Sequence, residues 1–235
     1  MDLGLAESRT RAQANIMAGR VRVDGQVASK AGVKYPVDAD ITCDAPPPYV
    51  GRGGHKLAGA LDAFGIDPKG LTALDAGAST GGFTDCLLQR GAAHVFAADV
   101  GYGQLDQKLA QDARVTVMDR TNVRHLTPTD LPAPVDLVVG DLSFISLKLV
   151  LPALSGVLSP GGAMVLLVKP QFEVGRENVG KGGIVRDEAQ RQKAVDDVAA
   201  AAIGAGLVYH GQVTSPITGA KGNVEFLIHL SKQGI

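Results

Sequence analysis

The chain has 235 residues, of which 45% are hydrophobic, and a net charge of −1, so it can build one full core and a small appended domain but carries no overall field that would attract nucleic acid. Its two cysteines lie far apart and match neither a disulfide framework nor a metal-ligand spacing. The start of the chain lacks the charged and apolar regions of a signal peptide, and no apolar run approaches the ~18 residues of a membrane span, so we expect a cytoplasmic protein without a metal site.

Residues 1–43 differ from the rest of the chain because basic residues are concentrated there. Apolar residues at helical spacing predict a helix that ends at Gly19, and residues 21–27 alternate around an Asp-Gly pair, which is typical of a β-hairpin. The run S-R-T-R-A-Q-A-x-I-M-A-G-R-V-x-V-D-G resembles the S4 RNA-binding module, although the stretch that ordinarily precedes this helix is shortened or missing. The resemblance implies contacts with RNA phosphates by Arg9, Arg11, Arg20 and Arg22. A charged face on a small accessory domain is the alternative.

A proline-rich linker is predicted at residues 44–51, because three consecutive prolines favour a stiff, extended segment. The remaining residues, 52–235, form the main predicted domain. It opens with a helix that follows Arg52 and stops near Gly65.

Residues 71–85 read as a strand, a glycine-rich turn and the start of a helix. The turn places backbone N–H groups and a helix N-terminus next to Asp75, at the edge where open α/β sheets bind ligands. The glycine spacing differs from that of dinucleotide-binding loops. An acid followed by Gly-x-x-x-Gly-Gly instead resembles the first motif of S-adenosylmethionine-dependent methyltransferases, whose ligand carries an ammonium and a carboxylate. The implied cofactor contacts are Asp75, Gly77, Ala78, Ser79, Thr80, Gly81, Gly82 and Phe83.

Strands and helices alternate from residue 71 onward, which predicts an α/β fold with a mostly parallel sheet covered on both faces. The connection at 215–223 is too short for a parallel crossover, so the last two strands should form an antiparallel hairpin. We therefore predict a Rossmann-like, seven-stranded sheet closed by that hairpin. The strands are expected at 71–75, 94–99, 115–118, 135–141, 163–169, 208–214 and 224–230, and the helices near 80–90, 103–111, 146–158 and 187–205.

Acidic residues follow three of the predicted strands and are candidates for cofactor contacts. Asp99 is placed to accept hydrogen bonds from two ribose hydroxyls, with a surface turn as the alternative. Asp119 is placed to face the adenine amino group. Asp141 and Leu142 follow the fourth strand, which in this architecture faces the transferred methyl group. The run after this strand is Asp-Leu-Ser-Phe rather than the Asn/Asp-Pro-Pro-Tyr of many amino-methyltransferases, which argues against methylation of a base nitrogen.

Charged residues also interrupt two apolar strands and open one helix. Lys169 ends an apolar strand before Pro170, Glu225 lies in another, and Lys56 is in the first turn of the helix after the linker. Buried charges need partners. Together with Asp141 they resemble the Lys-Asp-Lys-Glu tetrad of FtsJ-like ribose 2′-O-methyltransferases. A structural cluster of ion pairs is the alternative.

Five motifs in order resemble the TlyA family over nearly the whole chain. They are Y-V-x-R-G-G-x-K-L, D-x-G-A-S-T-G-G-F-T-D, D-L-S-F-I-S, K-P-Q-F-E-V-G and G-N-x-E-F. Members of this family join an S4 module to an FtsJ-like domain, methylate ribosomal RNA at cytidine ribose and have also been described as haemolysins. The resemblance implies S-adenosylmethionine as cofactor, ribosomal RNA or a ribosomal subunit as partner, and catalysis by Lys56, Asp141, Lys169 and Glu225.

In this mechanism Lys169 handles the proton of the ribose 2′-hydroxyl, which is a weak nucleophile at neutral pH. The neighbouring cation Lys56 favours the neutral amine of Lys169, whereas Asp141 and Glu225 oppose it while orienting the group. Asp141 orients Lys169 and the methyl donor, and Lys56 and Glu225 position the ribose. Much of the rate is expected from the alignment of oxygen, methyl carbon and sulfur.

The loop between Gln171 and Asp187 is rich in glycine and is predicted to close over RNA as a lid. Phe172 is expected to stack on a base, with core packing as the alternative, and Arg176 and Lys181 to contact the RNA. Two further functions stay open at this point: an RNA-binding protein without turnover and a haemolysin-like membrane-active protein. The sequence leaves the modified nucleotide, the ribosomal subunit and the oligomeric state undetermined.

Overall fold

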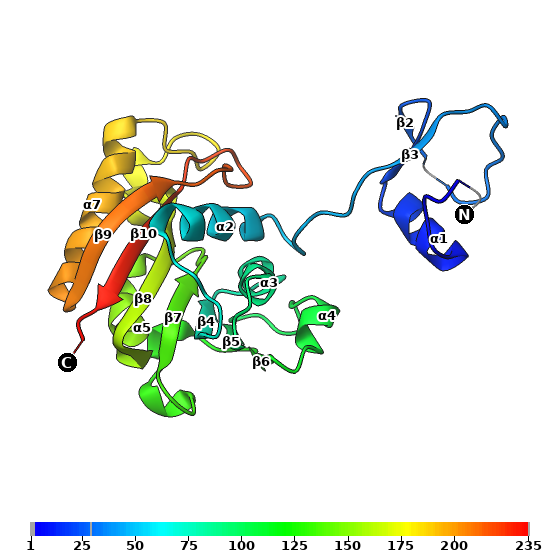
Figure 1. Cartoon of the computed structure of the whole chain (residues 1–235). Coiled ribbons are helices and arrows are strands. Elements are labelled where there is room, and N and C mark those ends of the chain that lie inside the picture. The colour runs from blue at the N-terminus through cyan, green and yellow to red at the C-terminus, as the bar shows by residue number, and fades with distance from the viewer. Residues whose placement is uncertain (1–2, 29, 235) are drawn as a thin grey trace. The chain divides into compact units, whose positions relative to one another are not determined.

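The computed structural model describes residues 3–28 and 30–234. The chain divides between Pro48 and Tyr49 into two compact units (Figure 1). Each unit is built from its own elements and is considered separately.

The first unit contains one helix and a small antiparallel sheet. Helix α1 (Arg9–Met17) begins at Ser8, whose hydroxyl accepts a hydrogen bond from the Arg11 amide at 3.1 Å. Strands β1 (Val21–Val23) and β2 (Gln26–Val27) form the predicted hairpin, and β3 (Ile41–Cys43) pairs with the other edge of β1. The sequence did not predict β3, because three residues are too few to show a strand pattern.

The second unit is a seven-stranded sheet with the order β6-β5-β4-β7-β8-β10-β9. The pairs among β4 to β8 are parallel, and β10 is antiparallel to both β8 and β9, which confirms the predicted fold class. The strands are β4 (Thr72–Ala76), β5 (His94–Ala98), β6 (Val115–Met118), β7 (Val135–Gly140), β8 (Leu158–Val168), β9 (Leu207–Thr214) and β10 (Phe226–Lys232).

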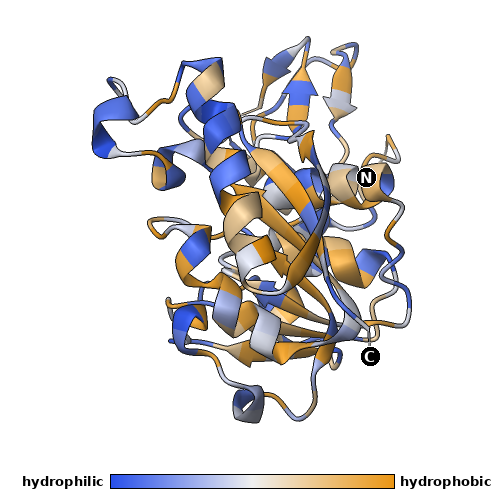
Figure 2. Ribbon diagram, turned by 90° about the vertical axis from the view of Figure 1, so that its left-hand side faces the viewer, coloured by the Kyte–Doolittle hydropathy of each residue, from blue (hydrophilic) through white to orange (hydrophobic). Residues whose placement is uncertain are grey.

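Helices cover both faces of this sheet. One apolar core lies under α5 and α7, and a second lies under α2, α3 and α4. Neighbouring residues of one strand alternate between the cores: Leu137 and Val139 face the second core, whereas Val138 faces the first. In Figure 2 the strands of this sheet are mainly orange, as expected for strands buried on both faces.

The helices differ in length from one another and several are single turns. The α-helices are α2 (Gly53–Phe64), α3 (Gly82–Gln89), α4 (Gln107–Ala110), α5 (Leu151–Val157), α6 (Pro170–Glu173) and α7 (Glu188–Gly204). The 3₁₀ turns are η1 (Val123–His125), η2 (Pro128–Asp130), η3 (Leu147–Leu149) and η4 (Arg176–Asn178).

Among the predicted boundaries that differ from the structure, three have a clear local reason. Strand β8 begins at Leu158 rather than at 163, because an irregularity in its pairing with β7 accommodates the Pro-Gly-Gly run. Strand β10 begins at Phe226 rather than at 224, because its partner β8 stops at Val168 and Pro170 then starts α6. Helix α4 begins after Asp106, which caps it, rather than at 103.

No helix within residues 3–28 and 30–234 is long and apolar enough to cross a bilayer. The same residues contain no group of three or more His, Cys, Asp or Glu side chains arranged to hold a metal ion.

Candidate active site

The sheet topology explains how charged residues far apart in the sequence reach one place. Asp141 directly follows β7 and Lys169 directly follows β8, and these parallel strands end at the same edge of the sheet. Strand β10 runs the opposite way and starts at that edge, since Phe226 pairs with Val168, so Glu225 lies just before it. Lys56 comes from the first turns of α2, which packs against the same sheet.

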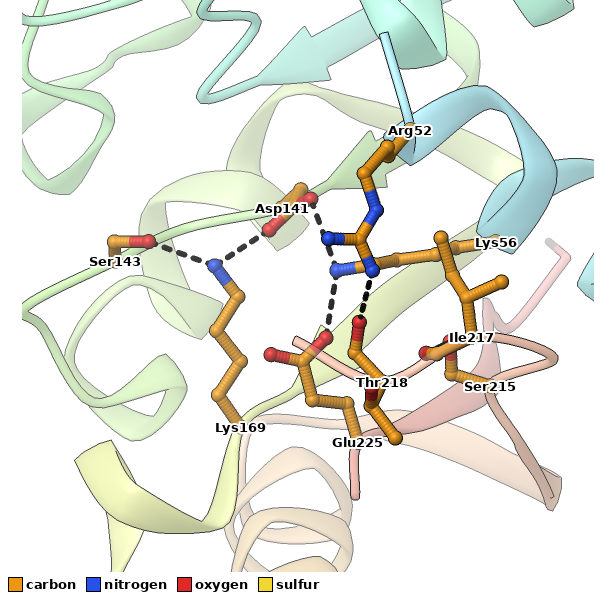
Figure 3. A network of polar contacts seen from close by, with 9 residues as sticks. All are labelled: Arg52, Lys56, Asp141, Ser143, Lys169, Ser215, Ile217, Thr218 and Glu225. Atoms are coloured by element: carbon orange, nitrogen blue, oxygen red, sulfur yellow. Dashed lines mark hydrogen bonds and ion pairs between the residues drawn. The ribbon is translucent and has the colours of Figure 1, made fainter. Parts of the chain in front are cut away.

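The four side chains form one network of ion pairs (Figure 3). Lys56 Nζ lies 2.6 Å from Glu225 Oε2 and 3.8 Å from Asp141 Oδ2. Lys169 Nζ lies 2.6 Å from Asp141 Oδ1. Asp141 therefore bridges the two lysines, and the structure brings together all four residues that the sequence singled out as the tetrad.

Burial makes this network costly to form and sensitive to change. Glu225, Lys56 and Lys169 are 3%, 7% and 9% exposed, whereas Asp141 is partly exposed. Two cations and two carboxylates balance one another, which limits the cost of removing charges from water. Removing one partner would leave an uncompensated charge. Asp141, Lys169 and Glu225 each line a surface hollow.

Two residues that were not among the predicted site residues lie at this place: Ser143 joins the network and Arg52 lies beside it. Lys169 Nζ donates to the Ser143 hydroxyl at 2.7 Å, and Arg52 Nη2 donates to the Thr218 carbonyl at 2.8 Å (Figure 3). Arg52 thereby links the start of α2 to the connection between β9 and β10. Both residues fall within the motifs D-L-S-F-I-S and Y-V-x-R-G-G-x-K-L, but a serine in a turn and an arginine after a linker do not by themselves indicate a role.

The glycine-rich loop between β4 and α3 passes close to its neighbours at two points. Gly77 has φ +86°, and a Cβ there would lie 3.0 Å from the Asp141 carbonyl oxygen. Gly81 has φ +98° and precedes α3, and a Cβ there would overlap the Leu109 side chain. Both positions require glycine, so the loop can lie against the end of β7 and aim the N-terminus of α3 outward.

Asp75 lies beneath this loop rather than on its surface. It is fully buried, and the Thr84 hydroxyl donates to its Oδ2 at 2.7 Å. Its Oδ1 has no hydrogen-bond partner within the described part of the chain. Burial raises the pKa of Asp75 to about 7, while the hydrogen bond from Thr84 acts in the opposite direction.

Two adjoining hollows open at this edge of the sheet and share Gly77, Ser79, Asp141 and Ser143. The smaller, of about 220 Å³, follows the glycine-rich loop and includes Phe83 among its lining residues. The loop residues in its wall are Gly77, Ala78, Ser79, Thr80 and Gly82. Gly81 is not in the wall; it caps α3 instead.

The larger of these hollows, of about 480 Å³, is lined by Asp99 and Leu142 among others. Asp99 accepts hydrogen bonds from the amides of Ser79 at 2.8 Å and Gly101 at 2.7 Å, so it also fixes the loop. Asp119 does not line the hollow; its carboxylate accepts from the Gly103 amide at 3.1 Å. The wall is completed there by the segment that follows, Thr121 to Val123, which the sequence did not indicate.

A third hollow, of about 280 Å³, lies on the other side of Lys169 and includes Glu225 in its wall. Phe144 and Phe172 lie there with their ring centroids 5.3 Å apart, and Lys169 Nζ is 5.9 Å from the centre of the Phe172 ring. Phe144 is 91% exposed and has φ +64°, which is unusual for a bulky residue. The sequence analysis named Phe172 as a candidate for stacking on a base but did not name Phe144.

The segment between Gln171 and Asp187 contains α6 and η4 and is attached to the connection between β9 and β10 through Asn223. This buried amide accepts from the Val185 amide at 3.0 Å and donates to the Gly183 carbonyl at 2.8 Å. Arg176 and Lys181 are exposed on this segment. The predicted loop is therefore an ordered strap with basic side chains on its outer surface.

The four arginines predicted to contact RNA differ in their surroundings in the first unit. Arg9 and Arg11 are exposed on α1. Arg20 donates to the Asn15 side chain at 2.7 Å, and Arg22 forms an ion pair of 3.1 Å with Asp44. Arg9 and Arg11 are therefore exposed and have no side-chain partner among the described residues, whereas Arg20 and Arg22 each have one.

Comparisons with known proteins cover nearly the whole chain. Residues 49–232 match the model of the FtsJ-like methyltransferases, and residues 2–41 match the S4 domain. A relative from Mycobacterium tuberculosis, named 16S/23S rRNA (cytidine-2′-O)-methyltransferase TlyA, is 52% identical over 98% of this chain and 87% of its own. Hemolysin A of Brachyspira hyodysenteriae is 42% identical over 96% of this chain and 95% of its own.

Solved structures agree with these matches. A protein from Streptococcus thermophilus, named as a hemolysin, superposes with a TM-score of 0.79 at 44% identity and covers 99% of this chain and 86% of its own. An S-adenosylmethionine-dependent methyltransferase from Mesorhizobium loti gives a TM-score of 0.58 at 17% identity over 77% of this chain and its own full length. At that identity the likeness shows the fold alone.

Proposed function

Because the chain belongs to the TlyA family, whose members join an S4 domain to an FtsJ-like methyltransferase domain, we propose that it methylates a ribose 2′-hydroxyl of ribosomal RNA with S-adenosylmethionine as cofactor. The observation that carries this proposal is the convergence of Lys56, Asp141, Lys169 and Glu225 at one edge of the sheet. The name of the M. tuberculosis relative makes cytidine the expected target nucleotide.

The residues at this edge fit the cofactor. The hollow of about 480 Å³ has the size of a small-molecule site, and the smaller one beside it runs along exposed loop amides. Asp99 would accept hydrogen bonds from the cofactor ribose, and the residues from Gly77 to Thr80 would hold its amino-acid end. Asp75 would act from beneath by fixing Thr84 and the loop. Bound S-adenosylmethionine supplies a methyl group on a positively charged sulfur.

The tetrad residues would align the ribose and remove its proton. Lys169 is the proposed acceptor of the 2′-hydroxyl proton, because its Nζ opens onto both the cofactor-side and the third hollow. Asp141 pairs with Lys169 and would hold it in place, and the Lys56–Glu225 pair is proposed to position the ribose. A neutral amine at Lys169 is required for this step.

RNA would be held by aromatic and basic side chains around the third hollow and on the first unit. Phe144 and Phe172 present ring faces on which a base removed from its helix can stack. Arg176 and Lys181 on the strap, and Arg9 and Arg11 on α1, are proposed to contact phosphates.

Transfer of tritium from labelled S-adenosylmethionine to ribosomal RNA tests this function. We expect the wild-type protein to label the RNA and the Lys169→Ala variant to lose at least 100-fold in rate while its cofactor affinity, measured by calorimetry, stays within a few-fold. Binding of RNA by the wild type without any transfer would favour the alternative of an RNA-binding protein without turnover. Wild-type rates for Lys169→Ala would remove Lys169 from the mechanism.

A further inference from the structure

The two lysines of the network differ in the ion-pair and hydrogen-bond partners around their nitrogen atoms. Lys56 Nζ is surrounded by two carboxylates, Glu225 at 2.6 Å and Asp141 at 3.8 Å. Lys169 Nζ has one carboxylate, Asp141 at 2.6 Å, and one neutral partner, the Ser143 hydroxyl at 2.7 Å. Figure 3 shows Ser143 and Asp141 reaching the Lys169 nitrogen from different sides.

This difference decides which lysine keeps a hydrogen-bond partner when it loses its proton. A carboxylate only accepts, so it stabilises an ammonium and has nothing to offer a neutral amine. A hydroxyl accepts from the ammonium and, after rotating its proton, donates to the lone pair of the amine. Ser143 therefore supports Lys169 in both states, whereas Lys56 has partners for the charged state alone among the described residues.

The position of Ser143 gives it access to every group that would react. It is exposed, and it is in the wall of all three hollows: the one along the glycine-rich loop, the one beside Asp99, and the one that holds Phe144, Phe172 and Glu225. Lys169 is 9% exposed and so offers little surface of its own. Ser143 therefore presents to the hollows a hydroxyl that is already hydrogen-bonded to the lysine nitrogen.

We propose that Ser143 is a catalytic residue that relays the ribose proton to Lys169. This rests on the function proposed above. The ribose oxygen forms its bond to the methyl carbon as the carbon–sulfur bond breaks, with that electron pair remaining on sulfur. The 2′-hydroxyl proton passes to Ser143 Oγ while the proton of Ser143 passes to the neutral amine of Lys169. The products are a methylated ribose, a restored serine hydroxyl and an ammonium at Lys169, so protons and charge balance.

The test compares Ser143→Ala and Ser143→Thr in the full-length protein under single-turnover conditions with ribosomal RNA. Ser143→Ala should react about 100-fold more slowly, within the range for the absence of general acid–base catalysis, whereas Ser143→Thr keeps a hydroxyl and should recover most of the rate. Both variants should bind S-adenosylmethionine within twofold of wild type in calorimetry and melt at the wild-type temperature. Ser159→Ala, at the far end of β8, is the matched control and should react at the wild-type rate.

Two readouts distinguish a relay from a merely structural role. The single-turnover rate of the wild type in mixtures of H₂O and D₂O should curve as expected for two protons in flight, and the curve should straighten in Ser143→Ala. The second readout is the recovery of the rate in Ser143→Thr, because the threonine restores the hydroxyl that a relay requires.

A rate for Ser143→Ala within threefold of wild type, equal rates for the Ala and Thr variants, or a linear wild-type isotope plot would each overturn the relay. A wild-type protein that transfers no methyl group to ribosomal RNA would instead overturn the proposed function.

Discussion

At the scale of single residues, Asp75 lies beneath the glycine-rich loop, and its protonation affects the stability of the fold. It is fully buried, and its pKa is raised from 3.8 to about 7, mainly by burial. Between these pH values the folded protein holds a proton that the unfolded chain releases. Folding stability therefore falls as the pH rises from about 4 to 7 and levels off above 7.

Asp75→Asn should remove this pH dependence while keeping an acceptor for the Thr84 hydroxyl. Between pH 5 and pH 8 the wild type should lose on the order of 2 kcal/mol more unfolding free energy than the variant, since one pKa unit corresponds to about 1.4 kcal/mol. Urea unfolding followed by circular dichroism at several pH values measures this difference. The exposed carboxyl Asp38 offers a control in Asp38→Asn, and parallel curves for wild type and Asp75→Asn would show that Asp75 does not titrate in this range.

Two members of the tetrad stand out in the sequence because each is a charge at the end of an apolar strand, and the resemblance to FtsJ-like methyltransferases grouped them with Lys56 and Asp141. Lys169 ends an apolar strand, and Glu225 lies just before another. Such residues are conspicuous because a buried charge needs a partner. Ser143 and Phe144 are not unusual residue types for a turn, so the sequence does not single them out. Their placement at the site depends on the backbone of this turn, in which Phe144 has φ +64°. Asp119 directly follows β6 and accepts from the Gly103 amide, and its contact with the adenine amino group stays a prediction.

At the scale of elements, the loop between β4 and α3 depends on the conformation of Gly81. Its φ of +98° is strained for any residue with a Cβ, and that atom would meet Leu109 and lie 2.8 Å from Leu105 Cδ1. Gly81→Ala should lower the unfolding free energy by roughly 1–3 kcal/mol and weaken cofactor binding at least tenfold, as measured by denaturation and calorimetry.

The matched control for this substitution is Gly156→Ala in α5, where a Cβ would meet nothing within 4 Å. An alanine there should raise stability by roughly 0.5–1 kcal/mol, because it improves helix propensity, and should leave cofactor binding unchanged. Equal effects of the two substitutions would contradict the role assigned to the loop.

The strap between Gln171 and Asp187 is held by the side chain of Asn223, which makes two buried hydrogen bonds to it. Asn223→Ala should release the strap and speed tryptic cleavage after Arg176, Lys181 and Arg186 at least tenfold. Asn178→Ala, which removes only a hydrogen bond to Glu177 in the same segment, is the control. Bound RNA should slow cleavage of the wild type, and unchanged cleavage with RNA would count against a strap that contacts it.

The strands that carry the site could be predicted more closely than the helices between them. Buried strands show as apolar runs with sharp ends, so the predicted bounds of β4, β5, β6 and β7 agree with the structure to within one residue. The segment predicted as one helix at 146–158 is η3 followed by α5, with Pro152 at the start of the latter, where proline is tolerated. The sequence did not predict the short helices α6 and η4 of the strap. A helix of three or four residues is too short to show apolar residues repeating at helical spacing.

At the scale of the whole molecule, the chain combines a small unit, in which acidic residues offset the basic ones, with a larger unit that contains the candidate active site. The net charge is close to zero, so attraction to RNA must come from local groups rather than from the chain as a whole. The exposed Arg9 and Arg11 on α1 are the groups of the first unit that are best placed for phosphate contacts.

Replacing both of these arginines, in Arg9→Ala with Arg11→Ala, should weaken RNA binding while leaving cofactor affinity unchanged. The slope of the logarithm of the binding constant against the logarithm of the salt concentration should fall by about 0.7–0.9 for each phosphate that the protein no longer neutralises. Filter-binding or fluorescence titrations at several salt concentrations measure it. Arg114→Ala, at a residue paired with Asp112 in the second unit, should leave the slope unchanged; an unchanged slope in the double variant would remove α1 from the RNA-binding surface.

The most direct measurement is the position of the methyl group on the RNA. Ribosomal RNA from cells that lack the protein is incubated with S-adenosylmethionine and either wild type or Lys169→Ala, and then cleaved with alkali, which requires a free 2′-hydroxyl at each step. The wild type should leave a gap in the cleavage ladder at a cytidine, and Lys169→Ala should leave none. A methyl group found on a base, or a complete ladder after incubation with a wild-type protein that binds both cofactor and RNA, would contradict the account.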